Sequence, residues 1–349
     1  MKNNIKAISV IIGTMIGAGF ASGKEVYVFF AQYKIMGLIG AVVSSIITAI
    51  VIYATLKISK SYKIENNNKF VDIISKKDNM STIVKNIINT FLLASFWIMC
   101  AGLCSFFKQE FDIPIIITAL ISGCIIYILL MTNIEGIMKL NTLIVPIMIL
   151  AILYISIINS QTAQIFELDN MANVGAIRAI IKAILYTSYN SILLIPIIVS
   201  MSRDVKNDKD IKRIAIISSL IIFILLILIY QMLICAKTDI SKIEMPILSL
   251  LEKEIWQKII YGIAIVSAII TSVVSASYGA LENIKDKTKY KMSAIAICLL
   301  EIPISYIGFG NLVSTLYPVF GAIGIVQIIL ILKTSNSIAK TVKNWYKLL

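Results

Sequence analysis

The sequence predicts an all-α polytopic membrane protein with ten transmembrane helices, arranged as a five-plus-five inverted repeat with discontinuous helices 1 and 6. Three observations lead to this class. Hydrophobic residues make up 58% of the 349 positions, the mean hydropathy is +0.90, and apolar runs of membrane-spanning length recur throughout. Polar interruptions fall in the first span of each half. Lys and Arg gather in alternate loops.

Ten apolar segments account for the ten helices. They are expected at 5–33, 36–57, 83–107, 113–131, 140–158, 177–201, 212–236, 257–281, 292–308 and 311–332. The inverted repeats run approximately over 5–158 and 177–332, within a single transmembrane domain, 1–349. Because five is an odd number of spans, the second half must cross the membrane in the opposite direction to the first.

Basic residues set the orientation of these spans. The loop 57–85 contains seven lysines, whereas the next loop, around Lys108, is nearly bare of Lys and Arg. Cytoplasmic loops carry the excess of Lys and Arg, so both termini are expected in the cytoplasm. The amphipathic stretch 246–252 is expected across the outer mouth, and 70–74 is expected to form a surface helix inside.

The first span is interrupted by glycine. Four glycines fall in the eleven residues 13–23, and each costs roughly 1 kcal/mol relative to alanine inside a helix. A helix that breaks inside the membrane usually lines a cavity, where its freed backbone groups can bind an ion or a solute. The alternative is that the Gly-x-x-x-Gly pairs are packing faces for a neighbouring helix.

Two charges directly follow these glycines. Lys24 and Glu25 are functional candidates, because a charge inside a membrane costs about 2.5–3.5 kcal/mol on insertion scales. We expect Glu25 to line the outer vestibule and to titrate during transport. The alternative is a neutralising Lys24–Glu25 salt bridge that extends outward. A third intramembrane charge, Glu301 near Pro303, is expected to cap a kink or to pair with a neighbour.

The sixth span carries a run of polar side chains. Five of the six residues 186–191 have hydroxyl groups, the sixth is an amide, and Pro196 follows. Such side chains compete for backbone hydrogen bonds, and proline removes a donor, so a second break is predicted. The alternative is that these groups bind adjacent helices.

Span eight adds a polar face. Ala268, Thr271 and Ser272 lie at i, i+3 and i+4, on one side of a helix. Hydroxyl and carbonyl oxygens form a neutral ligand set that suits Na⁺. The alternative is that these hydroxyls bond the carbonyls of their own helix.

Enzymatic chemistry is not expected. The chain has no histidine, and its five cysteines lie in apolar runs without paired spacing. No nucleophile–base pair or metal-ligand set can be assembled from these residues. The formal net charge of +13 follows from the membrane topology, so we expect no nucleic-acid partner and no cofactor other than a coupling ion.

The glycine-rich segment 12–23, followed by Glu25 and Phe29-Phe30, resembles the opening of the YkvI-like family of bacterial membrane proteins. That family is similar to the amino acid–polyamine–organocation superfamily, which has the LeuT-type fold. The resemblance covers essentially the whole chain in span number and loop lengths. It implies a solute site formed by Gly17, Ala18, Gly19, Phe20, Ala21, Ser22, Gly23, Tyr186, Thr187, Ser188, Tyr189 and Asn190. It further implies a sodium site formed by Gly13, Ile16, Ala268, Thr271 and Ser272.

One residue departs from that family. Position 24 is usually uncharged and polar there, whereas this chain has Lys24. A cation so near the implied sites would repel Na⁺, pair with Glu25 or favour an anionic substrate. These alternatives stay open at the level of sequence.

The expected function is cation-coupled secondary transport of a small solute, an amino acid or related zwitterion, across the bacterial cell membrane by alternating access. Na⁺ is the expected coupling ion and H⁺ the alternative. A different class is a ligand-sensing receptor, similar to spore-germinant receptor subunits, which would bind solute without ion-coupled flux. The expected partners are the solute and the lipid bilayer, and oligomeric state is open.

Overall fold

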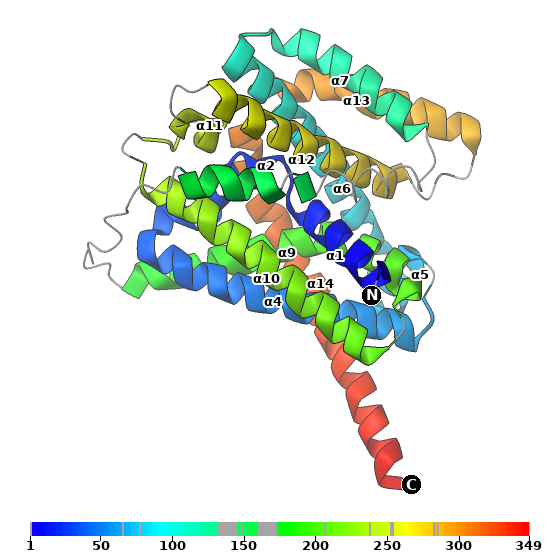
Figure 1. The fold of residues 1–349 in the computed structure, drawn as a ribbon. Coiled ribbons are helices and arrows are strands. Elements are labelled where there is room, and N and C mark those ends of the chain that lie inside the picture. The colour runs from blue at the N-terminus through cyan, green and yellow to red at the C-terminus, as the bar shows by residue number, and fades with distance from the viewer. Residues whose placement is uncertain are drawn as a thin grey trace.

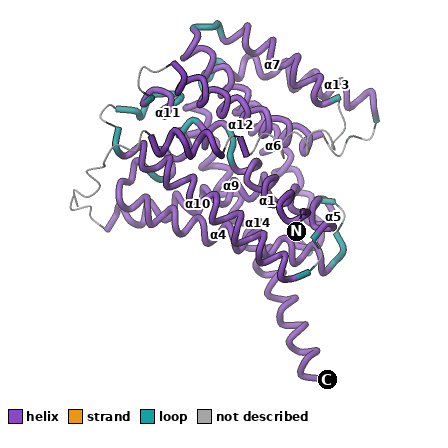
Figure 2. Tube along the Cα trace, in the orientation of Figure 1, coloured by secondary structure: helices purple, strands orange, loops and turns teal. Residues whose placement is uncertain are grey.

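Helices form almost all of the described structure (Figure 2). The computed structural model describes residues 2–64, 66–76, 78–131, 146–147, 149–158, 173–205, 207–236, 239–251, 255–281, 284 and 286–348. In chain order the helices are α1 (Lys2–Met15), α2 (Ala18–Ala21), α3 (Lys24–Phe29), α4 (Lys34–Ser61), α5 (Asn67–Ser75), α6 (Asp78–Phe111), α7 (Ile115–Leu130), α9 (Asn173–Met201), α10 (Asp208–Ile234), α11 (Pro246–Leu250), α12 (Ile255–Leu281), α13 (Lys287–Ser305) and α14 (Phe309–Leu348), with 3-10 turns at Ala31–Tyr33 and Ser202–Asp204.

The helices cover most of the predicted spans, with two differences among the described residues. The end of the first predicted span is joined to the second in Lys24–Ser61, and α13, over most of 292–308, is not among the apolar helices long enough to cross a membrane. Six are long and apolar enough to cross a membrane: Lys24–Ser61, Asn79–Phe111, Gly175–Asp204, Asp208–Ile234, Ile255–Leu281 and Phe309–Ser337. Shorter apolar helices are Asn4–Met15, Ile115–Leu130 and Ile149–Ile158. Part of the predicted span 140–158 lies outside the described residues. The chain is therefore a multi-pass membrane protein, while the ten-span inverted repeat and the cytoplasmic termini stay predictions.

The predicted break in the first span is confirmed, and it occurs in two steps. α1 ends at Met15, and Gly17 is extended, with φ −92° and ψ −171°. One helical turn later Gly23 has φ +82°, a left-handed conformation that costs other residues energy but is open to glycine. The glycine-rich segment thus folds as α1, α2 and α3 rather than as one rod.

The predicted break in the sixth span is wrong. α9 runs without interruption from Asn173 to Met201, with Pro196 inside it. Its polar side chains bond the preceding turn of their own helix: Ser188 Oγ donates to Ile184 O at 2.7 Å, and Asn190 Nδ2 donates to Tyr186 O at 3.0 Å. Hydrogen bonds of this kind satisfy the side chain without taking the backbone out of the helix.

The long helices pack into two groups with the broken span between them (Figure 1). One group contains α4, α9, α10 and α14, with α9 packed against both α4 and α14. In the other, α6 packs against α12, and α7 lies beside α13. α1 contacts α9, α10 and α12, and α2 contacts α6 and α12, so the break faces both groups. The C-terminal part of α14 extends away from the bundle.

Both predicted amphipathic stretches include a helix. α11 covers most of 246–252, of which Glu252 lies outside the described residues. α5 covers 70–74, but its apolar face is not free for a membrane surface. Phe70 and Ile74 are buried in a cluster with Ile195 of α9 and Ile331 of α14.

Candidate functional site

Glu25 is buried beside the break in the first span. Only 2% of the Glu25 surface is exposed, and its Oε2 accepts a 2.6 Å hydrogen bond from the Tyr189 hydroxyl of α9. The carboxyl group also packs against Gly19, where an added Cβ would lie 2.1 Å from Oε1. Glu25 therefore folds back onto the break instead of lining an open outer vestibule, and this part of the prediction is corrected.

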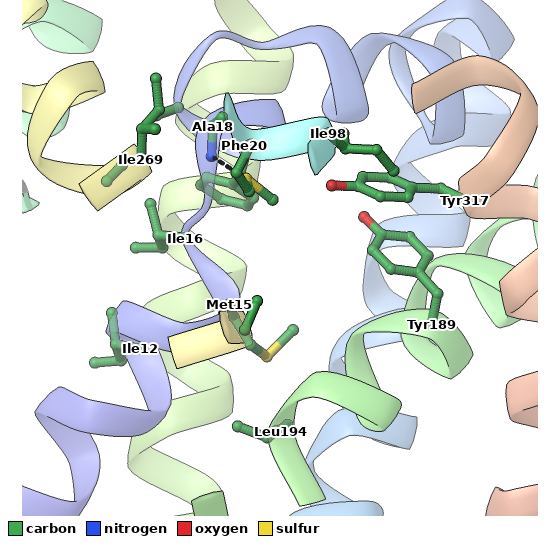
Figure 3. Packing of buried hydrophobic residues seen from close by; sticks show 14 of the residues in the cluster. Ile12, Met15, Ile16, Ala18, Phe20, Ile98, Tyr189, Leu194, Ile269 and Tyr317 are labelled. Carbon is green, nitrogen blue, oxygen red and sulfur yellow. Dashed lines mark hydrogen bonds between the residues drawn. The ribbon is translucent and has the colours of Figure 1, made fainter. Parts of the chain in front are cut away.

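Aromatic rings surround the Glu25 carboxyl group. We call Phe29, Tyr186, Tyr189 and Tyr317 the aromatic cage. Tyr189 stacks on Tyr317 at 4.4 Å between ring centroids, and Tyr186 meets Tyr189 edge-on at 5.6 Å. Phe29 lies 5.5 Å from Tyr189. Figure 3 shows Tyr189 and Tyr317 reaching from two helices with their hydroxyl groups towards the broken span.

Two hydroxyl groups of this cage have no partner. The Tyr186 and Tyr317 hydroxyl oxygens are fully buried and make no hydrogen bond to any residue that the structure describes. A buried polar group without a partner costs about 1–3 kcal/mol. A bound solute or water is the ordinary way to satisfy such a group, so the cage has free capacity for a polar ligand.

Lys24 points away from Glu25. Its Nζ donates to the carbonyl oxygens of Ser241 and Ile243, each at 2.8 Å. The Glu244 carboxylate is close enough to attract Lys24, and it accepts a hydrogen bond from the backbone N–H of Gly310 at the start of α14. Lys24 thus has partners other than Glu25, unlike in the alternative of a Lys24–Glu25 salt bridge.

The second break, after α2, is covered from one side by protein. Ile247 of α11 donates its backbone N–H to Ser22 O at 3.0 Å, and the Tyr261 hydroxyl of α12 donates to Ala21 O. Gly23 lies against Ile247 so closely that an added Cβ would be 2.7 Å from it. Two backbone carbonyls freed by the break thus bond to the protein, and α11 closes this end of the site.

The sodium candidates lie where α12 meets the first break. Thr271 Oγ1 donates to Ala268 O at 3.0 Å, so the Thr271 hydroxyl hydrogen is used within α12. Ser272 Oγ is buried without a partner, and an added Cβ at Gly17 would lie 3.1 Å from it. Gly13 and Ile16 are buried in and directly after the last turn of α1. Ser272 is therefore the sodium candidate whose side chain faces the break.

The remaining solute candidates separate into two sets. Gly17 to Gly23 all lie buried in the broken segment, and their part in solute binding stays a prediction. On α9, Tyr186 and Tyr189 belong to the aromatic cage, whereas the Thr187 hydroxyl hydrogen-bonds to the Ser44 hydroxyl of α4 at 2.8 Å. Ser188 and Asn190 bond their own helix, so these three do not line the Glu25 site.

Several residues at the site were not predicted from the sequence. The Met99 thioether of α6 accepts the Ala18 N–H at 3.2 Å. Ser95 of α6, near Ser272, has a buried hydroxyl without a partner among the described residues. Tyr317 completes the cage from α14. An isolated Met, Ser or Tyr in an apolar helix gives no local signal, because its role depends on a neighbour that is distant in sequence.

Sequence comparisons give relatives without an assigned activity. No protein-family model matches the chain. The uncharacterized protein YyaD of Bacillus subtilis (strain 168) is 22% identical over 340 residues, which cover 94% of this chain and 96% of the relative. The uncharacterized membrane protein YkvI of the same organism is 26% identical over 330 residues, covering 90% and 91%. The second similarity agrees with the resemblance of the glycine-rich segment.

Solved structures give a fold. A manganese transporter of Eremococcus coleocola matches with a TM-score of 0.65 and 13% identity, over 95% of this chain and 78% of the transporter. A Na⁺-coupled sialic acid symporter matches with a TM-score of 0.61 and 14% identity, over 91% and 76%. The chain has the fold of these transporters.

Proposed function

We propose that this protein is a secondary transporter of a small solute that carries an ammonium group, an amino acid or related zwitterion, coupled to Na⁺. The observation that carries the proposal is the buried Glu25 carboxyl group beside a broken helix. Its sequence neighbour Lys24 is held by other partners, 2.8 Å from the carbonyls of Ser241 and Ile243. The negative charge is thus left for a ligand.

The chemistry around Glu25 suits an ammonium group. A buried carboxylate is costly unless a cation or a proton is beside it. Aromatic faces attract cations by about 0.5–2 kcal/mol, and Tyr189 and Tyr317 present rings next to the carboxyl group. The unpartnered hydroxyl groups of Tyr186 and Tyr317 add hydrogen-bonding capacity for the polar remainder of the solute.

The coupling ion is assigned to Na⁺ on the chemistry of α12. Ser272 Oγ is a buried oxygen without a partner, directly against the break at Gly17. Hard cations prefer oxygen ligands, and backbone carbonyls near a helix break are available to complete the set. The Ser272 hydroxyl lies on α12, while Glu25 lies on α3, so ion and solute would meet through the broken span.

Alternating access then requires the covered end to open. α11 rests on the second break through the Ile247–Ser22 hydrogen bond, and Lys24 ties α3 to the segment that precedes α11. Entry of solute from this side must break these contacts. Coupling follows if Na⁺ bound near Ser272 changes the geometry of the same broken span.

H⁺ coupling remains the second candidate, because Glu25 is itself a buried acid. In that case the carboxyl group carries the proton and the solute need not be cationic. A ligand sensor with this fold would bind the same solute without flux. These functions differ in measurable ways.

The test is ligand-dependent thermal stabilisation of the purified full chain. The common amino acids, their decarboxylated amines and their deaminated acids are screened in NaCl and in choline chloride. At 100 times its dissociation constant a ligand adds about 2.7 kcal/mol of stability, which a melting shift reveals. The proposal expects hits among ammonium-bearing solutes that need Na⁺ and are lost in Glu25→Gln. Hits confined to the deaminated acids would contradict it, and hits indifferent to Na⁺ would favour H⁺ coupling or a sensor.

A further inference from the structure

A second buried carboxyl group lies outside the Glu25 site. Glu301 is on α13, is 0% exposed, and packs where α13 meets α6 and α7. Pro303 is two residues further along the same helix. The Ser122 hydroxyl of α7 donates to Glu301 Oε1 at 2.6 Å. The sequence-based expectation that Glu301 pairs with a neighbour is therefore met by Ser122.

The other carboxyl oxygen is left without a partner. Glu301 Oε2 is fully buried and makes no hydrogen bond within the described part of the chain. Thr118, one turn before Ser122 on α7, also has a buried hydroxyl oxygen without a hydrogen-bond partner among the described residues. Two unpartnered oxygens, on Glu301 of α13 and on Thr118 of α7, thus lie close to the Ser122–Glu301 hydrogen bond at one helix junction.

The groups that face Glu301 are neutral hydrogen-bond donors. Cys100 and Cys104 of α6 and Cys298 of α13 are close enough to interact with the carboxyl group. α7 contributes the Ser122 hydroxyl and packs Gly123 against the carboxyl carbon, where an added Cβ would lie 3.7 Å away. None of these named groups supplies a positive charge.

The donor set selects the ligand. A buried carboxylate needs a cation or a proton beside it. Within the described residues there is no group of three or more His, Cys, Asp or Glu that could hold a metal ion. Na⁺ requires several oxygen lone pairs, but here the Ser122 hydroxyl donates its hydrogen to the carboxyl group and the neighbouring Cys100 contributes no oxygen. A proton needs only one free oxygen, and Oε2 is free.

We propose that Glu301 is the proton-binding group of a second buried site, at the junction of α6, α7 and α13, with the proton on Oε2. Protonation forms the Oε2–H bond and neutralises the carboxylate, while Ser122 continues to donate to Oε1. Release returns the proton to water when α7 separates from α13. The site is independent of the solute and of the coupling ion proposed above.

Access to this site follows the surface of α7. An apolar groove lined by Leu103, Thr118, Ser122 and Val273 runs along one flank of α7, and another, lined by Gly123, Cys124 and Cys298, runs along the other flank. The grooves thus reach Ser122 and Gly123, the two α7 residues that contact the Glu301 carboxyl group. A hydrophobic carbodiimide, which attaches to protonated carboxyl groups, can approach Glu301 through these grooves.

Infrared spectroscopy of the purified full chain tests the proposal. Wild type, Glu301→Gln and the surface control Asp112→Asn are compared across a pH titration, in NaCl and in choline chloride. The wild-type spectrum at neutral pH should contain the carbonyl-stretch band of a protonated carboxylic acid. The part of that band that belongs to Glu301 should disappear in Glu301→Gln, remain in Asp112→Asn and be unaffected by Na⁺. The difference between the wild-type and Glu301→Gln spectra separates it from any contribution of Glu25. If Glu301→Gln does not fold, Glu301→Asp replaces it and should shift the band.

The proposal is overturned if removing Glu301 changes only carboxylate bands at every pH, since the group is then ionised. It is also overturned if NaCl abolishes the protonated band, which would assign the pocket to Na⁺. Carbodiimide labelling, read out by peptide mass spectrometry, is the second measurement. Labelling of the Glu301 peptide should fall as pH rises, and labelling that rises with pH would contradict the assignment.

Discussion

The Tyr189 hydroxyl donates a 2.6 Å hydrogen bond to Glu25 Oε2 and joins the middle of α9 to the start of α3. Tyr189 is 1% exposed and Glu25 is 2% exposed, so water does not replace the bond when it is lost. The residues are distant in sequence, and their contact fixes where the broken span sits against the continuous helix.

Removing this donor should destabilise the protein. Tyr189→Phe keeps the ring stack on Tyr317 but leaves the Glu25 oxygen unpartnered, which should lower the free energy of unfolding by about 1–3 kcal/mol. Thermal melting of the purified chain measures the loss. Tyr62→Phe is the matched control, because Tyr62 is 47% exposed. Equal melting temperatures for the two variants would show that the bond contributes nothing.

Gly19 should be required for the same contact. In Gly19→Ala the new methyl group would overlap Glu25, 2.1 Å from Oε1, so the carboxyl group must move away from Tyr189. Because both changes break one hydrogen bond, Gly19→Ala and Tyr189→Phe should be less than additive in a double-mutant cycle of melting and solute binding. Gly123→Ala, whose methyl group meets only ordinary contacts at 3.6 Å and beyond, serves as the steric control. If the effects of the two substitutions add fully, Gly19 is not required for the hydrogen bond between Tyr189 and Glu25.

Ser272 should carry the dependence on Na⁺. Its hydroxyl has no partner, so Ser272→Ala should barely change stability in choline chloride but should abolish the extra stability gained in NaCl. That gain is about 2.7 kcal/mol when Na⁺ is at 100 times its dissociation constant. Ser275→Ala is the control on the same helix, since Ser275 Oγ donates to Thr271 O at 2.8 Å. A Na⁺ effect that survives in Ser272→Ala would exclude Ser272 as a ligand.

Lys24 should hold the covered end of the site closed. Lys24→Met removes two hydrogen bonds, to Ser241 O and Ile243 O, and should free the segment that leads into α11. Hydrogen–deuterium exchange of residues 241–251 should then become faster. Lys242→Met changes an exposed lysine in the same segment and should leave exchange unaltered. If the two variants exchange alike, Lys24 does not restrain this segment.

The first break was predictable because its cause is local. Glycines at 17 and 23 adopt an extended and a left-handed conformation in the same short stretch, and the sequence alone indicates such freedom. The prediction of a break in the sixth span was wrong because the same polar side chains can either break a helix or hydrogen-bond within it. On α9 Thr187 and Ser191 donate to the carbonyls four residues earlier, at 3.0 and 2.6 Å, and the helix continues.

Long-range partners were beyond sequence reasoning. Glu25 was singled out because it is a charge in an apolar span, but neither its donor Tyr189 nor the stacked Tyr317 follows from spacing. Likewise, three outcomes were open for Lys24, and its actual carbonyl partners lie more than two hundred residues away in the chain. The partners of Glu25 and Lys24 are set by tertiary packing, which brings together residues that are distant in sequence.

Uptake into proteoliposomes tests the central claim most directly. Purified wild type and Glu25→Gln are reconstituted and supplied with a radiolabelled mixture of the common amino acids, with or without an inward Na⁺ gradient. The account predicts that the wild type accumulates label only with the gradient, that a sodium ionophore abolishes accumulation, and that Glu25→Gln shows none. Accumulation that is equal in Glu25→Gln, or wild-type protein that binds solute yet never accumulates it, would contradict the account.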